Sequence, residues 1–219
     1  MHKYLKELIV CPYCKQPLDW NISREDGVHI IDARVKCSER KREYFVEGRV
    51  ACFLPEHDGK KDNWQRGESF LTAYFAKSPE AKEKLLNTPL ELLNAADLQA
   101  LASVLKEQGD KTGSMKVSEL AKEKTYVVNS RRAILSQMNY ETKQFADIEG
   151  FIVDIASGMG GLAGQLLKET NMDIVASDIS YYVMKESQAK VSADYINRIS
   201  YIAFDVNYIP FEDNSIDYL

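Results

Sequence analysis

The first 58 residues carry short apolar runs of the kind that form β-strands. Turn residues separate the runs, and Glu47-Gly48 precedes the last of them. The pattern predicts strands at 28–31, 34–37, 44–46 and 50–54. A stretch rich in Pro, Gly, Asp and Lys at 55–62 predicts a linker. Residues 1–58 are therefore expected to form a small β domain.

Residues 63–145 show the helical period, with apolar residues at intervals of three and four. One stripe consists of Phe70, Leu71, Tyr74 and Phe75. A second stripe consists of Leu90, Leu93, Ala96, Leu98, Leu101 and Leu105. The helix of this second stripe is predicted to begin at Pro89, after a capping Thr88. Gly109–Ser114 interrupts the helical pattern, and a third helix is predicted over Val117–Tyr140. Such stripes are typical of a packed core, so this region is predicted to be a helical linker or cap.

From residue 146 onward, short apolar strands alternate with helices of about ten residues. The predicted strands are 151–155, 173–178, 199–204 and 216–219, and the predicted helices are 161–169 and 180–192. This alternation is typical of an α/β fold with a parallel, doubly wound sheet. Residues 146–219 therefore form the third predicted region.

A glycine-rich loop joins the first of these strands to its helix. Glycines let the backbone turn sharply and approach a ligand, and a helix N-terminus offers free N–H groups. Gly158, Gly160 and Ala163 satisfy the spacing of the dinucleotide fingerprint, and Asp178 follows Gly158 by 20 residues. The loop alone therefore leaves a nicotinamide- or flavin-dependent oxidoreductase open.

Two motifs resemble the class I, type 11 S-adenosyl-L-methionine-dependent methyltransferases. Asp154–Gly160 resembles their D-x-G-x-G-x-G, with Ala156 in place of the first glycine. Asp205–Asp217 resembles their D-x-x-x-x-P-F-x-D-x-S-F-D. The resemblance implies a Rossmann-like domain that binds S-adenosyl-L-methionine. The methyl acceptor (RNA, protein or small molecule) and the catalytic base stay unassigned.

The resemblance also implies a role for each matching residue. Asp178 would accept hydrogen bonds from the ribose hydroxyls, and Asp205 would contact the adenine amine. Asp154 would support the loop and the methionine ammonium. The complete expected cofactor set is Asp154, Ala156, Gly158, Gly160, Asp178, Asp205 and Val206. Ala156 departs from the pattern only in disfavouring a positive φ or a very close approach.

All four cysteines lie in the first 52 residues, which points to a metal site or its relic. Cys11-Pro12-Tyr13-Cys14 is a C-x-x-C knuckle, and Cys37 adds a third thiolate. The segments 8–18 and 44–50 resemble the small zinc-ribbon family that activates tRNA and release-factor methyltransferases. That family has a second C-x-x-C, where this chain has Arg40 at the fourth ligand position.

The resemblance implies zinc, and a metal-free ribbon is the alternative. The expected ligand set is Cys11, Cys14, Cys37 and Cys52. Cys52 could equally be a small buried hydrophobic residue, and His29 is a further candidate.

The sequence ends at Leu219, inside the fourth strand of a seven-stranded family pattern. We therefore expect an incomplete domain that does not itself transfer methyl groups. It should either self-associate through its open sheet edge or be poorly ordered there. A non-enzymatic ribbon or scaffold protein is the remaining alternative.

Charge and composition narrow the setting. The 219 residues carry a net charge of −5, with a pI near 5.4, so nonspecific nucleic-acid binding is disfavoured. Residues 34–49 have a net charge of +3, consistent with a solvated hairpin face or a phosphate contact. No apolar run is long enough for a membrane span or a signal peptide, so a cytoplasmic location is expected.

Overall fold

The computed structural model describes residues 1–54, 71–125 and 128–219. Met1–Asp62 and Met138–Leu219 together form one compact unit, and Asn63–Gln137 form a second. The predicted linker at 55–62 and the start of the helical region at 63–70, including Phe70, lie outside the described residues.

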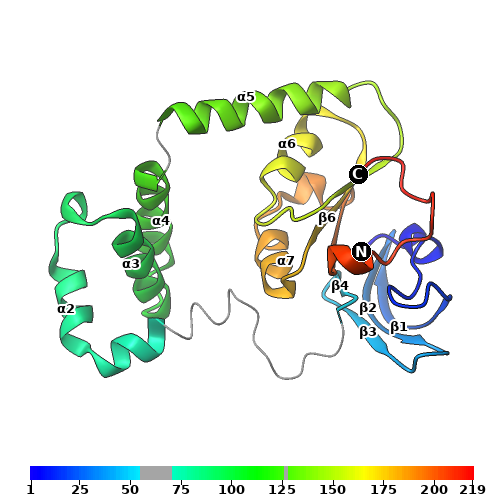
Figure 1. Cartoon of the computed structure of the whole chain (residues 1–219), viewed down its shortest axis with the longest axis horizontal. Helices are drawn as coiled ribbons and strands as arrows, with labels where there is room; N and C mark the ends of the chain where they lie inside the picture. The colour runs from blue at the N-terminus through cyan, green and yellow to red at the C-terminus, as the bar shows by residue number, and fades with distance from the viewer. Residues whose placement is uncertain (55–70, 126–127) are drawn as a thin grey trace. The chain divides into compact units, whose positions relative to one another are not determined.

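The first unit is built on one seven-stranded sheet, in the order β1-β2-β3-β4-β7-β6-β5 (Figure 1). Its strands are β1 (Leu18–Asp26), β2 (His29–Cys37), β3 (Glu43–Glu47), β4 (Val50–Cys52), β5 (Phe151–Asp154), β6 (Asp173–Asp178) and β7 (Ile199–Ala203). Strands β1 to β4 pair antiparallel, whereas β4 pairs parallel with β7 and continues through β6 to β5. Residues 1–58 and 146–219, predicted as separate regions, are thus joined in one sheet through β4 and β7.

The antiparallel half differs from the prediction in two strands. The strand β1 was not predicted, although its apolar residues alternate at Leu18, Trp20 and Ile22. The predicted strands 28–31 and 34–37 are one continuous strand, β2. Asp32 interrupts the apolar run without breaking the strand, because its side chain leaves the buried face while the two-residue alternation continues.

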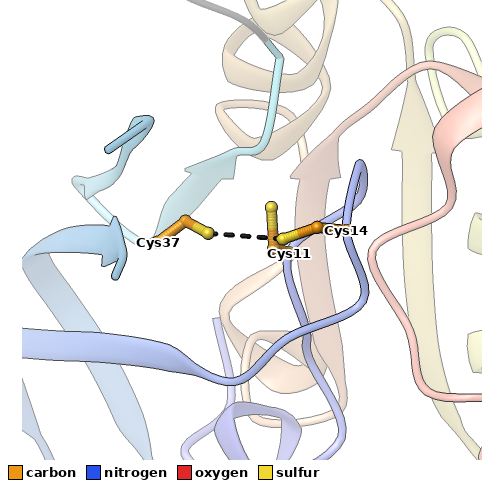
Figure 2. A group of neighbouring side chains, drawn as sticks. All are labelled: Cys11, Cys14 and Cys37. Atoms are coloured by element: carbon orange, nitrogen blue, oxygen red, sulfur yellow. Dashed lines mark hydrogen bonds between the residues drawn. The ribbon is translucent and has the colours of Figure 1, made fainter. Parts of the chain in front are cut away.

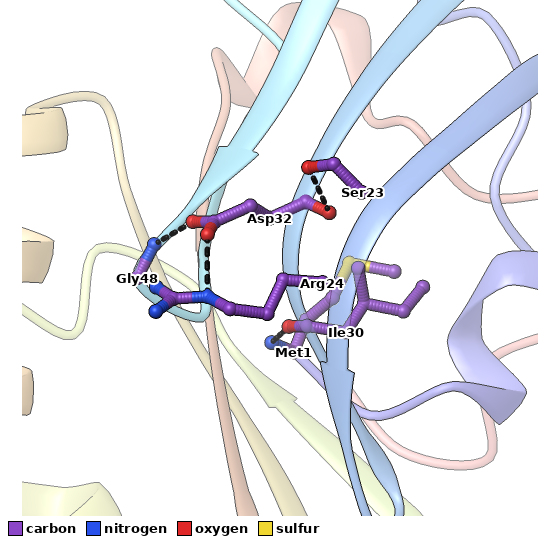
Figure 3. Close-up of polar contacts among 6 residues, drawn as sticks. All are labelled: Met1, Ser23, Arg24, Ile30, Asp32 and Gly48. Carbon is purple, nitrogen blue, oxygen red and sulfur yellow. Dashed lines mark hydrogen bonds and ion pairs between the residues drawn. The ribbon is translucent and has the colours of Figure 1, made fainter.

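The Asp32 carboxylate ties three segments of this half together (Figure 3). It accepts hydrogen bonds from the backbone N–H of Gly48 at 2.8 Å and from Nε of Arg24 at 2.7 Å. The β3–β4 turn is thus fixed to β1 and β2. Two basic residues of the 34–49 stretch also have acidic partners, since Lys36 pairs with Glu43 and Arg49 pairs with Asp26.

The parallel half follows the predicted alternation, and the α/β, Rossmann-like prediction is confirmed. The helix α6 (Gly161–Glu169) follows β5, and α7 (Tyr181–Gln188) follows β6. The predicted strand at 216–219 is reduced to one parallel bridge between Ile152 and Tyr218. The helix predicted to reach Ser192 ends at Gln188, where Ala189 caps it.

Alternate residues of the strands enter two different cores. Helices α6 and α7 cover one face of the sheet (Figure 1), and Cys52, Ala176 and Tyr201 point to that side. The opposite face packs against the N-terminal segment, including the 3₁₀ helix η1 (Tyr4–Glu7), and against Phe211.

The second unit is helical and has its own core around Leu98 and Ala121. Residues 71–77 are helical, and α2 (Pro79–Asn87), η2 (Leu90–Leu92), α3 (Ala95–Glu107) and α4 (Lys111–Thr125) follow. A further helix, α5 (Val128–Gln144), leads into the first unit. None of the described helices has the length and apolarity that crossing a membrane requires.

Three helix boundaries differ from the prediction. Thr88 ends α2, and Asn94 instead caps α3 by accepting from the N–H of Asp97. The helix α4 begins at Lys111 and includes Gly113, because Asp110 accepts from the Gly113 N–H and nucleates the turn. The single helix predicted at 117–140 is divided between α4 and α5.

Candidate functional site

The predicted cofactor residues meet at one edge of the sheet because β5, β6 and β7 run parallel. Asp154 ends β5 and Asp178 ends β6. Asp205 follows β7 by two residues. Ligands of open α/β sheets bind outside the carboxyl ends of the strands, so this edge is the candidate cofactor site.

The loop between β5 and α6 has three residues in the left-handed region of backbone conformation. The φ angles are +56° at Ala156, +54° at Gly158 and +78° at Gly160, which caps α6. A side chain at Gly160 would come within 2.8 Å of Ser187 Oγ, whereas the space at Gly158 is open. Oδ2 of Asp178 accepts from the Gly158 N–H at 3.2 Å. The loop is thereby held against the end of β6.

The Ala156→Gly variant is expected to be more stable by about 1 kcal/mol. A left-handed conformation costs an L-residue about 1–2 kcal/mol, and glycine's greater unfolded entropy offsets part of the gain. Urea denaturation of the two proteins measures the difference. Ala163→Gly within α6 is the control and should destabilise the protein; a similar loss from Ala156→Gly would contradict the strain at this position.

Two buried polar atoms of this loop have no hydrogen-bond partner among the described residues. They are Oδ2 of Asp154 and Oγ of Ser157. Burial raises the pKa of Asp154 to about 6, although its hydrogen bond with the Ala163 backbone opposes the shift. A cationic ligand would satisfy this carboxylate, and the methionine ammonium of the expected cofactor is such a group.

Exposed apolar side chains accompany the acids at the same edge. Ile179 directly follows Asp178 and is 62% exposed, and Val206 directly follows Asp205 and is 54% exposed. Asp205 itself caps a short turn by accepting from the N–H of Asn207 at 2.9 Å. Ile179 and Ser157 were not predicted. Ser157 occupies an unspecified position of the motif, whereas an apolar residue after a strand-ending acid is a weak signal for Ile179.

The structure brings three of the four predicted metal ligands together (Figure 2). The sulfurs of Cys11, Cys14 and Cys37 lie within 4.8 Å of one another. Four thiolates around zinc at 2.3 Å would be separated by about 3.8 Å, so these three positions suit one ion. Among the described residues, no fourth His, Cys, Asp or Glu ligand joins them.

Cys52 lies apart from this group. It belongs to the core between the sheet and α6 and α7, because its neighbour Ala51 takes the opposite face. Burial raises the pKa of Cys52 to about 11, which keeps the thiol neutral. Cys52 therefore packs as a small buried apolar residue and is not part of the cysteine group. His29, the further candidate, packs against the ring of His2 at 4.6 Å.

Two backbone turns of the same form present the cysteines. In residues 11–16 the N–H of Lys15 donates to the Cys11 carbonyl at 2.8 Å, and in residues 37–42 the N–H of Lys41 donates to the Cys37 carbonyl at 2.9 Å. Arg40 therefore takes the place in the second turn that Cys14 has in the first. The two turns thus have the same form, and together they present three thiols.

The environment of Cys11 favours its thiolate. Burial alone would raise the pKa of this thiol. Hydrogen bonds from the Tyr44 hydroxyl and from the backbone at Tyr13 and Cys14 outweigh burial and lower the pKa to about 7. The Tyr44 oxygen lies 3.4 Å from the sulfur.

Comparison with known proteins identifies the parallel half of the sheet. Residues 152–219 match the methyltransferase domain family. The ubiquinone/menaquinone biosynthesis C-methyltransferase UbiE of Rickettsia prowazekii is 30% identical over 81 residues, 34% of this chain and 33% of that protein. Its counterpart from Rickettsia felis is 28% identical over 83 residues, 35% of this chain and 34% of that protein.

A solved structure from Methanococcus maripaludis, described as an S-adenosyl-L-methionine-dependent methyltransferase, is 30% identical and covers 37% of each chain, with a TM-score of 0.34. The matched segment spans about a third of the curated relatives' length. The family match at residues 152–219 contains the glycine-rich loop, Asp178 and Asp205. Residues 152–219 of this chain are therefore similar to a methyltransferase domain.

Proposed function

We propose that this protein is an S-adenosyl-L-methionine-dependent methyltransferase whose cofactor lies at the carboxyl edge of β5, β6 and β7. The observation that carries the proposal is the pair of unpartnered buried polar atoms at Asp154 and Ser157, in a loop where the space at Gly158 is open. The methyltransferase relatives support it. The dinucleotide alternative uses the same loop, and a binding test separates the two.

Each residue of the edge has a role that follows from its position. The Asp154 carboxylate would accept from the methionine ammonium, and the Ser157 hydroxyl would donate to the carboxylate of the same end. Asp178 would accept from the ribose hydroxyls while it continues to hold the Gly158 N–H. Asp205 would accept from the adenine amine, and Ile179 and Val206 would contact the faces of the ring.

The cofactor supplies the reactive methyl group as a sulfonium. The protein then has to hold donor and acceptor in line and exclude competing water. Among the described residues we assign no general base that would remove a proton from the methyl acceptor. The acceptor class stays unspecified, because the match covers only about a third of the relatives' length.

Asp178→Ala is expected to weaken binding of S-adenosylhomocysteine by about 1.5–3 kcal/mol, since it removes a charged hydrogen-bond acceptor. Isothermal titration calorimetry measures the effect. Asp194→Ala, an acid of the short helix η3 (Ala193–Tyr195), is the control and should bind as the wild type does. Unchanged affinity in Asp178→Ala would remove this residue from the site. Binding of NAD(H) in place of S-adenosylhomocysteine would favour the oxidoreductase.

We further propose that Cys11, Cys14 and Cys37 bind one zinc ion. The close approach of the three sulfurs and the lowered pKa of Cys11 support a thiolate site. A water or another small ligand would complete the tetrahedron, because the described residues supply only three protein ligands. The metal would stabilise the two cysteine turns.

A further inference from the structure

The first cysteine turn is attached to the segment that follows β7. The N–H of Val10 donates to the Pro210 carbonyl at 2.9 Å, and the N–H of Glu212 donates to the Leu8 carbonyl at 2.9 Å. Ile9 and Phe211 form an antiparallel bridge between these two bonds. Residues 8–10 thus hold residues 210–212 by main-chain pairing, although the two segments are 200 or more residues apart in the sequence.

Two side chains of the turn extend this attachment toward Asp205. Nζ of Lys15 donates to the Ile209 carbonyl at 2.7 Å and to the Phe211 carbonyl at 3.2 Å. The ring of Tyr13 packs on that of Tyr208, with centroids 4.5 Å apart. The segment 205–209, which presents Asp205, is therefore held from its far end by the cysteine turn.

Lys15 makes these contacts from a backbone conformation that lysine disfavours. Its φ is +57°, in the left-handed region where a side chain is penalised and glycine is not. The second turn has the same feature at Lys41, whose φ is +53°. The described residues, however, include no hydrogen-bond or ion-pair partner for the Lys41 side chain. The strained backbone is common to both turns, but among the described residues only the Lys15 side chain is engaged, which indicates a role for that side chain.

We infer that Lys15 is a positioning residue for cofactor binding: it holds the segment 205–209 so that the Asp205 carboxylate meets the adenine amine. The inference rests on the proposed function. Lys15 contacts only carbonyl oxygens of the segment, so it acts through Asp205 and not on the cofactor directly. Its loss should affect the adenine end of the ligand and leave the methionine end as it is.

The test compares two ligands on the whole chain, S-adenosylhomocysteine and S-inosylhomocysteine, in which an oxygen replaces the adenine amine. Wild type should prefer the adenine ligand by about tenfold, the value of one charged hydrogen bond. Lys15→Gly should reduce this preference to about twofold or less, because the loop that presents Asp205 is released. Lys15→Arg should restore it.

Lys15→Gly also relieves the left-handed backbone strain, so it should fold at least as well as the wild type in urea denaturation. Lys41→Gly makes the same backbone change in the second turn and is the matched control. It should retain the tenfold preference. Loss of preference in both glycine variants would overturn the specific role of Lys15.

Asp205→Asn, measured in parallel, separates the positioning role of Lys15 from the adenine contact of Asp205. If Asp205→Asn loses the preference and Lys15→Gly keeps it, the positioning role is wrong and the cofactor site stands. If Asp205→Asn keeps the preference, the adenine contact is wrong, and the role of Lys15 falls with it.

Discussion

Asp154→Asn is expected to weaken S-adenosylhomocysteine binding by about 2–5 kcal/mol, the usual loss when one partner of a buried charge pair is neutralised. The side chain is half-buried, and its buried Oδ2 has no partner within the described structure. The amide of asparagine has nearly the same size, so the loop can keep its shape. The loss should therefore appear in ligand affinity and not in folding.

The same carboxylate should make cofactor binding depend on pH. Burial raises the pKa of Asp154 to about 6, above its ordinary value of 3.8. The carboxylate form binds the ligand ammonium, so wild-type affinity should be constant above about pH 7 and fall as the pH drops through 6. In the unliganded protein the sign for folding is opposite. The raised pKa means that protonation between pH 6 and 3.8 favours the folded state.

Isothermal titration calorimetry between pH 5 and 8 measures the ligand affinity and its dependence on pH. Asp154→Asn should give a weaker affinity without the step near pH 6. Asp194→Asn should behave as the wild type, because its side chain lies in the exposed turn at η3. A wild-type affinity that is flat across this range, or an Asp154→Asn variant that binds normally, would contradict the ammonium contact.

Cys11→Ser is expected to release the zinc and unfold the two cysteine turns. Structural zinc binding in small peptides is worth about 10–16 kcal/mol at neutral pH, so removing one of three protein ligands should have a large effect. Elemental analysis should find about one zinc per wild-type chain and almost none in the variant. Its thermal midpoint should fall, and chelator should lower the wild-type midpoint in the same way.

Cys52→Ala is the matched control, since Cys52 is also a buried cysteine of the N-terminal region but packs on the opposite face of the sheet from Cys11. It should retain the zinc. A wild-type protein that contains no metal and keeps its midpoint in chelator would favour the alternative of a metal-free ribbon. In that case the contact between Tyr44 and Cys11 would stabilise the turns in place of an ion.

The sequence was sufficient for the parts of the fold that depend on local pattern. The alternation of strand and helix from Phe151 to Ala203 matches β5, α6, β6, α7 and β7 closely. Positions of Asp178 and Asp205 followed from the motifs, because a βα loop has to place its first residues at the carboxyl edge of the sheet.

Contacts between distant segments could not be predicted in this way. The pairing of β4 with β7 depends on which sheet edge is open, and nothing in the sequence of either strand indicates which strand it pairs with. The left-handed backbone at Ala156 was also unexpected, since alanine gives no indication of it. To place Cys52, one has to know which face of β4 its side chain occupies. A strand of three buried residues shows no alternation from which that face could be predicted.

The parallel pairing of β4 with β7 also bears on how the protein is synthesised. Val50 pairs opposite Tyr201, so the partner of β4 leaves the ribosome about 150 residues later. At about 5–20 residues per second, the nascent chain carries an open β4 edge for about 8–30 s. The intervening helices can fold in that interval on contacts of their own. Completion of the sheet is thus a late, long-range step, and the waiting edge is where a chaperone would have most to protect.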